Sequence, residues 1–206
     1  NRALQFYKTL TDIKTHIKNK MSYKTFVIIA KYKENVSWVH EIFDESCTIS
    51  IYDKTKDYKN VGREAETFLR YILDIYDEIK NDDKIVLLQG HPFDHLQRPY
   101  DDKLFKHAIY ESNDDITPIS GSYCESDGNG YPHHVGLKIK EIWLTIFPED
   151  NEKKTWIFTP GAQYAIKGRC ILKYSKSFWT KLHKRVYDEN ICAWTFERFW
   201  YCIFTK

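Results

Sequence analysis

The sequence contains no apolar run that could span a membrane, and no secretory signal pattern opens it. Its longest apolar stretches, such as residues 26–30 and 85–88, are far shorter than the roughly 20 residues that a transmembrane helix needs. An excess of charge is also absent, because 31 Lys and Arg residues balance 29 Asp and Glu residues over 206 positions. Nucleic-acid-binding domains usually carry a strongly basic patch, so this near-neutrality argues against that class. We expect a globular protein that has no transmembrane segment and no nucleic-acid partner.

Methionine and cysteine are scarce in informative ways. The single Met is Met21 and the first residue is Asn1, so we expect the chain to be one domain of a longer protein. The five cysteines are odd in number, and no C-x-x-C pair occurs. This usage is typical of free thiols and argues against a disulfide framework and a cysteine–zinc site. We therefore expect the cytoplasm or another reducing compartment.

Several signatures of common enzyme classes are missing. The chain has no G-x-G-x-x-G dinucleotide fingerprint, no P-loop, no G-x-S-x-G nucleophile elbow and no H-E-x-x-H zinc motif. These absences argue against a dinucleotide-dependent oxidoreductase, a P-loop kinase, an α/β-hydrolase and a zincin.

The apolar residues that are present predict alternating strands and helices. Short apolar and β-branched runs predict strands at 25–30, 47–52 and 84–88, and helical spacing predicts helices at 34–43 and 62–80. This order within about 70 residues is typical of an α/β sheet with right-handed crossovers. We therefore expect a single α/β domain with a mainly parallel central sheet flanked by helices.

The remaining segments are less regular. An amphipathic pattern predicts a helix over residues 1–20, and residues 101–111 are a further helical segment. Residues 112–132 are rich in Gly, Ser, Asp and Asn, which predicts a loop that is either a mobile lid or a tolerated insertion. The other expected elements are a helix, alone or after a strand, in 136–147, strands at 155–159 and 163–166, and helices at 177–187 and 193–204.

The segment Gln89-Gly-His-Pro-Phe-Asp-His95 directly follows the third predicted strand. Ligands of open α/β sheets bind beyond the carboxyl ends of strands, so its position favours a functional role. His91, Asp94 and His95 are residue types that bind Mn²⁺ or Zn²⁺ or exchange protons. Alternatively, the two histidines cap the strand or pack as satisfied polar residues.

The segment Asn60-Val-Gly-Arg-Glu64 opens the long predicted helix. Free backbone N–H groups at a helix N-terminus attract anions, and Arg63 adds a bidentate donor for phosphate or carboxylate. Alternatively, Asn60 is an ordinary N-cap, and Arg63 and Glu64 are solvated charges.

Two segments in the second half of the chain are weaker candidates. Residues 159–166 form a small-residue turn that enters a strand, and this turn either admits a substrate or is a plain connection. Glu197 lies among aromatic residues, where its pKa could be raised for catalysis. Alternatively, Glu197 and Arg198 belong to a structural ion network.

Five segments carry a resemblance to a known family. They are Val27-Ile-Ile-Ala-Lys-Tyr-Lys-Glu34, Asn60-Val-Gly-Arg-Glu64, Leu88-Gln-Gly-His-Pro-Phe-Asp-His95, Pro160-Gly-Ala-Gln-Tyr-Ala165 and Glu197-Arg-Phe-Trp200. Over residues 24–204 the chain resembles a domain-of-unknown-function family found mainly in fungi, algae and large DNA viruses. For a viral protein, the expected location is the host cytoplasm.

That family in turn resembles glycosyltransferases of the GT-A fold, which implies binding of a nucleotide sugar linked to UDP or GDP. The resemblance assigns the nucleotide sugar to the ends of the first and third strands and the start of the long helix: Ala30, Tyr32, Glu34, Asn60, Gly62, Arg63, Gln89 and Gly90. It assigns the donor sugar or acceptor to the glycine-containing turn: Gly161, Ala162, Gln163 and Tyr164.

One departure from the GT-A pattern concerns the metal. No D-x-D motif follows Leu88, and His91, Asp94 and His95 stand where it is expected. The resemblance therefore implies either that these three residues bind Mn²⁺ or Mg²⁺ in modified form, or that the enzyme acts without metal and neutralises the leaving diphosphate with cations such as Arg63.

The sequence thus predicts a glycosyltransferase that transfers a sugar to a hydroxyl of a glycan or glycoprotein. Such an enzyme must position the acceptor and remove its proton, and Asp94 and Glu197 are the predicted bases. One alternative is a metal-dependent phosphoester or ester hydrolase, which would need a fuller ligand set than His91, Asp94 and His95, for instance with His133 or His134 converging on the cluster. Another is a carbohydrate-binding domain without catalytic activity.

Overall fold

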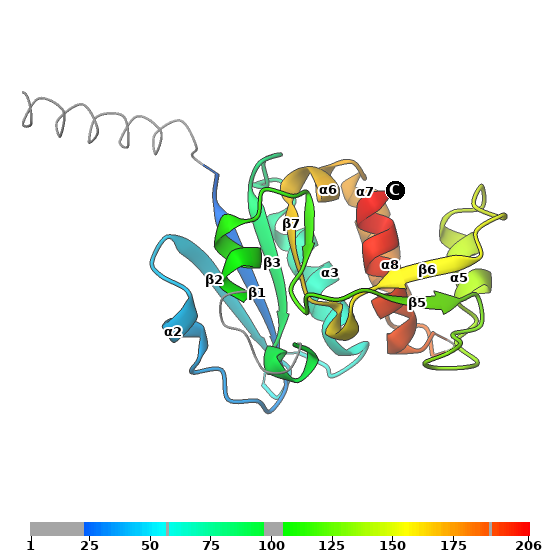
Figure 1. Cartoon of the computed structure of the whole chain (residues 1–206), viewed down its shortest axis with the longest axis horizontal. Helices are drawn as coiled ribbons and strands as arrows, with labels where there is room; N and C mark the ends of the chain where they lie inside the picture. Colours follow the sequence, from blue (N-terminus) through cyan, green and yellow to red (C-terminus); the bar gives the residue numbers. More distant parts are fainter. Residues whose placement is uncertain (1–22, 57, 97–104, 190) are drawn as a thin grey trace, which may run out of the picture.

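A five-stranded mixed sheet lies at the centre of the fold in the computed structural model (Figure 1). The structure describes residues 23–56, 58–96, 105–189 and 191–206. The strand order is β2–β1–β3–β7–β4, with bounds Cys47–Asp53, Thr25–Lys31, Lys84–Gln89, Tyr164–Lys167 and Ile116–Pro118. A two-stranded sheet beside it pairs β5 with β6, Cys124–Asp127 and Thr155–Phe158.

Helices and helical turns connect these strands. The α-helices are α2 Val39–Ile42, α3 Arg63–Ile75, α5 Ile139–Ile146, α6 Gly168–Leu172, α7 Lys176–Arg185 and α8 Ala193–Thr205. The turns are η1 Pro92–His95, the π-helical η2 His107–Glu111 and η3 Pro160–Ala162. Among the described residues, no helix combines the length and apolarity that crossing a membrane requires. The five cysteines are free thiols.

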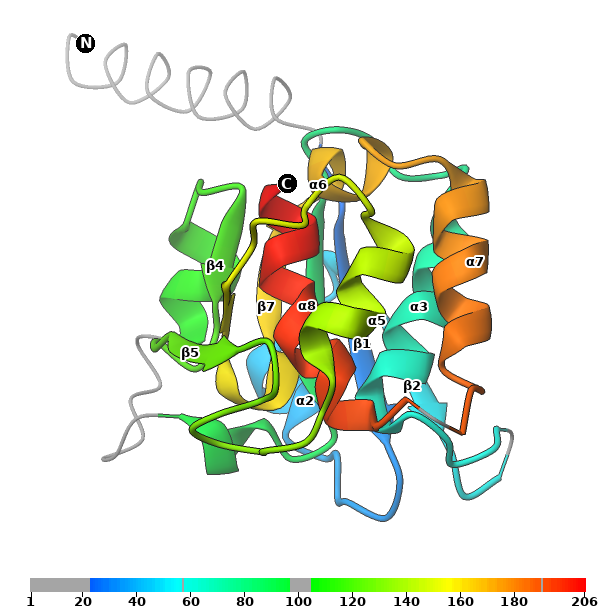
Figure 2. The ribbon, with the colours of Figure 1, turned by 90° about the vertical axis from the view of Figure 1, so that its right-hand side faces the viewer.

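The first half of the sheet folds as the sequence predicts. β1 pairs in parallel with β2 on one side and with β3 on the other. Alternate residues of β1 enter two different cores: Phe26 and Ile28 face the cluster that contains α3, α7 and α8, whereas Val27 and Ile29 face the cluster that contains α2 and η2. Figure 2 shows α5, α7 and α8 on the α3 side. Burial on both faces explains why these strands are continuous apolar runs.

The prediction of a mainly parallel sheet is wrong, because the central sheet is mixed. β7 runs antiparallel to β3 and to β4, and the β5–β6 pair is also antiparallel. The apolar composition of residues 163–166 correctly indicated a strand, but composition does not carry the strand's direction. Direction depends on where the chain re-enters the sheet after residues 119–163, which separate β4 from β7.

Several element boundaries also differ from the sequence predictions. Residues 34–43 form only the single turn α2, because the Glu34 carboxylate and the Asn35 side chain accept backbone N–H groups of the preceding loop. The predicted loop 112–132 contains β4 and β5. The predicted helix 1–20 lies outside the described residues, as does part of the predicted helix 101–111.

Glu66, which is buried in the first turns of α3, joins α3 to α7. Its Oε1 atom accepts hydrogen bonds from Arg70 Nε at 2.8 Å and the Tyr187 hydroxyl at 3.0 Å, and lies 3.3 Å from His183 Nε2. Lys54 Nζ lies 3.8 Å from Oε2. Burial by itself raises the pKa of Glu66, but the hydrogen bonds from His183, Arg70 and Tyr187 outweigh it and lower the pKa to about 2. The ionised carboxylate thus fixes the N-terminal part of α3 in the fold.

Replacing Glu66 with Gln is expected to lower the free energy of unfolding by about 3 kcal/mol at pH 7, because it leaves buried cationic partners without their counter-ion. Since the folded-state pKa lies below the ordinary value of 4.5, this stabilisation is complete above pH 4.5 and is lost as the pH falls toward about 2. Urea denaturation of both proteins over that range measures the difference. The exposed Glu152→Gln is the control, and a pH-independent difference would contradict the assignment.

Candidate functional site

A cavity of about 580 Å³ lies at the carboxyl ends of β1 and β3. The chain leaves β1 for β2 on one side and reaches β3 on the other, so this edge is the switch point at which α/β sheets bind ligands. The lining comes from the end of β1, the turn before α3 and the segment after β3: Ala30, Lys31, Tyr32, Glu34, Asn35, Lys54, Asn60, Arg63, Glu64, Gln89, His91, Asp94 and His95.

A second cavity of about 300 Å³ adjoins the first. The two have a common wall that consists of Arg63, Glu64, Gln89 and His95. The rest of the second cavity comes from η3, α8 and the segments around β5 and β6: Cys124, His133, His134, Phe158, Pro160, Gly161, Trp194, Glu197 and Arg198. Segments far apart in the sequence therefore line two adjoining spaces, which we call the large and the small cavity.

The turn that opens α3 has an unusual backbone. Gly62 and Arg63 both have positive φ angles, of 61° and 51°, and for Arg63 this left-handed conformation is strained. The buried Lys54 ammonium group holds the turn by donating hydrogen bonds to the carbonyl oxygens of Val61, at 3.0 Å, and Arg63. Burial lowers the pKa of Lys54 despite the nearby Glu66 and Glu64. The turn presents the half-exposed Arg63 side chain to both cavities.

The segment after β3 is fitted closely to the end of β1. A Cβ atom at Gly90 would lie 2.7 Å from Glu34 Oε2 and 3.1 Å from Glu34 Cβ, so a larger residue there would displace the Glu34 side chain. Glu34 in turn accepts the backbone N–H groups of Tyr32, at 2.6 Å, and Lys33. Gly90 and Gly62 shape the backbone around the large cavity and are not among its lining residues.

Gly161 brings the second half of the chain to the site. Its φ of 77° favours glycine, and a Cβ atom there would lie 2.5 Å from His95 Cδ2. Its N–H donates to Glu197 Oε1 at 2.8 Å, and the other Glu197 oxygen pairs with the buried Arg198. The interpretation of Glu197 and Arg198 as an ion network describes their geometry, and Glu197 holds the Gly161 turn.

Aromatic rings form one side of the small cavity. His134 stacks on Trp194 with ring centroids 4.2 Å apart, and its Nδ1 atom accepts a hydrogen bond from Arg198 at 2.8 Å. Burial and the Arg198 charge lower the pKa of His134, so the neutral ring is favoured. The guanidinium of Arg63 lies 5.8 Å from the Trp194 ring. Sequence analysis did not select Trp194, because an aromatic residue in an apolar helix is usually part of the core.

Three residues assigned to the donor sugar or acceptor do not line either cavity. Ala162, Gln163 and Tyr164 are fully buried. Gln163 is used inside the fold, where its side chain donates to the Pro92 carbonyl at 3.0 Å and accepts from the Gln89 N–H at 3.3 Å. Of the turn assigned to the acceptor, only Gly161 reaches the small cavity, and the other three residues position it.

The proposed metal ligands do not form one donor set. His91 Nε2 lies 3.2 Å from Asp94 Oδ1, whereas the His95 ring packs on Gly161. Within the described part of the chain, no group of three His, Cys, Asp or Glu side chains is arranged to hold a metal ion. His91 and Asp94 are also half or more exposed, at 50% and 71% of their side-chain surface. The residues present therefore do not fit the predicted three-ligand site for Mn²⁺ or Mg²⁺.

Glu64 does not fit the alternative in which it is a solvated charge at the start of the helix. Its side chain is only 8% exposed, and it belongs to the wall between the two cavities. Its Oε2 atom lies 3.6 Å from Arg63 Nε. Burial raises the pKa of Glu64 to about 7, although its own backbone N–H and the charge of Arg63 oppose that shift. A carboxyl group that titrates near neutrality inside a cleft is typical of functional sites.

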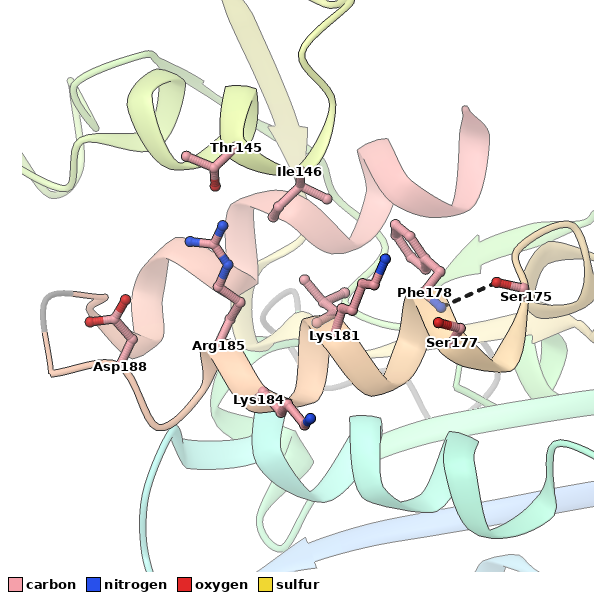
Figure 3. Close-up of a pocket in the computed structure, with 10 residues that line it drawn as sticks. Thr145, Ile146, Ser175, Ser177, Phe178, Lys181, Lys184, Arg185 and Asp188 are labelled. Carbon is pink, nitrogen blue, oxygen red and sulfur yellow. Dashed lines mark hydrogen bonds between the residues drawn. The ribbon is translucent and has the colours of Figure 1, made fainter.

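A further groove of about 650 Å³ lies away from this site, between α5 and α7 (Figure 3). Its walls include Thr145, Lys181 and Arg185. They also include Ser175, whose hydroxyl caps α7 by accepting the backbone N–H of Phe178. None of the residues that sequence analysis selected lines this groove. We therefore place the candidate site at the sheet edge, where those residues meet.

Comparison with protein families identifies a match for part of the chain. Residues 26–105 match the family model described as "Protein of unknown function (DUF3431)". This segment contains β1, β2, α3, β3 and η1, and hence most of the wall of the large cavity. No curated protein and no solved structure matches the chain.

Replacing Gly161 with Ala is expected to destabilise the protein by about 1–3 kcal/mol. The new methyl group must displace the His95 ring, and the alanine backbone must adopt a strained positive φ. Gly136→Ala is the matched control, since Gly136 also has a positive φ, of 97°, but no atom lies within 4 Å of the position that an added Cβ would occupy. Denaturant unfolding of the two variants separates the contact from the backbone strain. Equal destabilisation would show that the contact with His95 contributes nothing.

Proposed function

We propose that this protein is a nucleotide-sugar-dependent glycosyltransferase that transfers a sugar to a hydroxyl of a glycan or glycoprotein. The observation that carries the proposal is the convergence of the five sequence segments at one place. Parts of 27–34, 60–64 and 88–95 line the large cavity, and Gly161 and Glu197 line the small one. Nothing in the spacing of these segments along the chain requires them to meet.

The pair of adjoining cavities is consistent with a two-substrate transfer. At about 580 Å³, the large cavity is within the range of small-molecule sites and has room for a nucleoside diphosphate, and the small cavity suits a single sugar ring. A transfer between the two would take place at their common wall. Trp194 is partly exposed beside the stacked His134 and adds aromatic surface on which a sugar ring can pack.

Arg63 is the group best placed to stabilise the leaving diphosphate. It is half exposed, faces both cavities and stands at the first turn of α3, where backbone N–H groups favour a negative charge. By contrast, Lys31 is paired with Asp53 at 2.5 Å and Lys54 is bound to backbone carbonyls. The proposal therefore follows the metal-independent form of the reaction, with Arg63 as the principal cation.

The hydrolase alternative requires His133 or His134 to join the predicted metal ligands. Both histidines line the small cavity, where His95 also reaches, whereas His91 and Asp94 line only the large one. His134 also uses its Nδ1 atom to accept from Arg198. The geometry of these side chains favours the transferase.

We expect UDP or GDP to bind the protein, and Arg63→Ala to weaken that binding by about tenfold or more, the loss expected for one charge-assisted hydrogen bond. Arg169→Ala is the matched control, because Arg169 has a similar side-chain exposure, 46% against 50%, and lines neither cavity. Isothermal titration calorimetry gives the Kd values.

The reaction itself is tested by incubating the protein with UDP- and GDP-linked sugars and glycan acceptors, with Mn²⁺ or with EDTA. The expected result is release of UDP or GDP that depends on the acceptor. If no nucleoside diphosphate is bound or released under any of these conditions, the glycosyltransferase proposal is wrong.

A further inference from the structure

The carboxyl group of Glu64 occupies the one wall that the two cavities have in common. Glu64 is the second residue of α3, and the left-handed backbone of Gly62 and Arg63 turns the chain just before it. The side chain is 8% exposed and lines both the large and the small cavity. A group in this position can contact the acceptor in one space and the reacting carbon of the donor in the other.

The other carboxylates of the two cavities are engaged elsewhere or exposed. Glu34 accepts two backbone N–H groups, and Glu197 accepts the Gly161 N–H and pairs with Arg198. Asp94 is 71% exposed and contacts His91. Of the described residues that line the cavities, Glu64 is the carboxylate that is buried in the wall common to both, where its own backbone N–H and Arg63, 3.6 Å away, are its neighbours.

The surroundings of Glu64 allow it to gain and lose a proton near neutrality. Burial favours the neutral acid, whereas Arg63, 3.6 Å away, and Lys54 favour the carboxylate. Glu197, which reaches the same cavity from α8, favours the neutral acid again. These opposing effects leave the pKa at about 7, which suits a general base at physiological pH.

We propose that Glu64 is the catalytic residue that accepts the proton of the acceptor hydroxyl during sugar transfer. The inference rests on the proposed function. In this step the acceptor oxygen forms a bond to the anomeric carbon of the donor, the bond from that carbon to the diphosphate oxygen breaks, and its electron pair leaves with the diphosphate. The hydroxyl proton passes to a carboxylate oxygen of Glu64. Arg63 stabilises the diphosphate charge as it develops.

This assignment replaces Asp94 and Glu197 as the expected bases. Asp94 is 71% exposed and contacts His91, and it lines the large cavity alone. Glu197 acts through the Gly161 turn and is a positioning residue. Both residues keep a place in the site, but neither lies in the wall between the cavities.

The test compares Glu64→Gln with wild type in the nucleotide-release assay. We expect kcat to fall by about 10²- to 10⁴-fold, with little change in the KM of the nucleotide sugar, because only the proton transfer is removed. The exposed Glu78→Gln is the control and keeps wild-type kcat. In wild type, kcat should rise with pH through about 7, as Glu64 becomes ionised, and this rise should be absent from Glu64→Gln.

Two further variants separate a catalytic role from a structural one. Glu64→Asp keeps the carboxyl group one methylene further back, and we expect it to fold as wild type does and to retain part of the turnover. Glu64→Ala should recover turnover on addition of formate, which supplies a small carboxylate in the space that the side chain leaves. A purely structural Glu64 would not respond to formate.

The outcomes distinguish this assignment from the proposed function. If the wild type transfers sugar and Glu64→Gln does so equally well, or with the same pH profile of kcat, Glu64 is not the base. The glycosyltransferase proposal then still holds. Absence of transfer by wild type overturns both. Loss of kcat with retained KM and rescue by formate supports both.

Discussion

The site depends on one buried cation, the ammonium group of Lys54. It lies at the end of β2, donates to the carbonyl oxygens of Val61 and Arg63, and faces the buried Glu66 carboxylate. A buried carbonyl oxygen or carboxylate without a partner would destabilise the fold. By interacting with these groups, Lys54 allows the charged Glu66 side chain to be buried in the first turns of α3. Its hydrogen bond to the Arg63 carbonyl also stabilises the strained, positive-φ backbone of Arg63. The turn that presents Arg63 and Glu64 to the cavities is therefore held from beneath by a residue that needs no contact with substrate.

Much of the first half of the fold could be predicted because its signals are local. The apolar runs of β1 and β3 and the helical stripe of α3 are long enough to identify, and the strand ends then locate the large cavity. The one-turn helix α2 and strands β4 and β5 could not be predicted in the same way. They are short, and their conformations depend on side-chain hydrogen bonds and on pairing with residues 28 to 50 positions away.

The sequence located the candidate site more reliably than it assigned roles to the individual residues of that site. Because all three follow the same strand, the sequence gives His91, Asp94 and His95 equal weight as site residues. In the structure, the His95 ring packs on Gly161, whereas the Asp94 side chain is largely exposed to solvent. For Glu64, the sequence offered only the alternative of a solvated charge next to Arg63 at the start of a helix. Its burial arises from the left-handed turn and from α8, which approaches from more than 100 residues away. Exposure of a single charged side chain is a tertiary property, and no local pattern encodes it.

The direction of β7 is the strongest link between the fold and the site. In a parallel arrangement, the turn that enters β7 would lie at the opposite edge of the sheet from the carboxyl end of β3. Because β7 is antiparallel, its first residue, Tyr164, pairs with Leu87 near that end, and η3 is placed beside η1. Gly161 then reaches His95, and Glu197 of α8 follows through the Gly161 N–H. The antiparallel direction of β7, which the sequence did not predict, therefore places the small cavity next to the large one. As a result, Glu64 lines both.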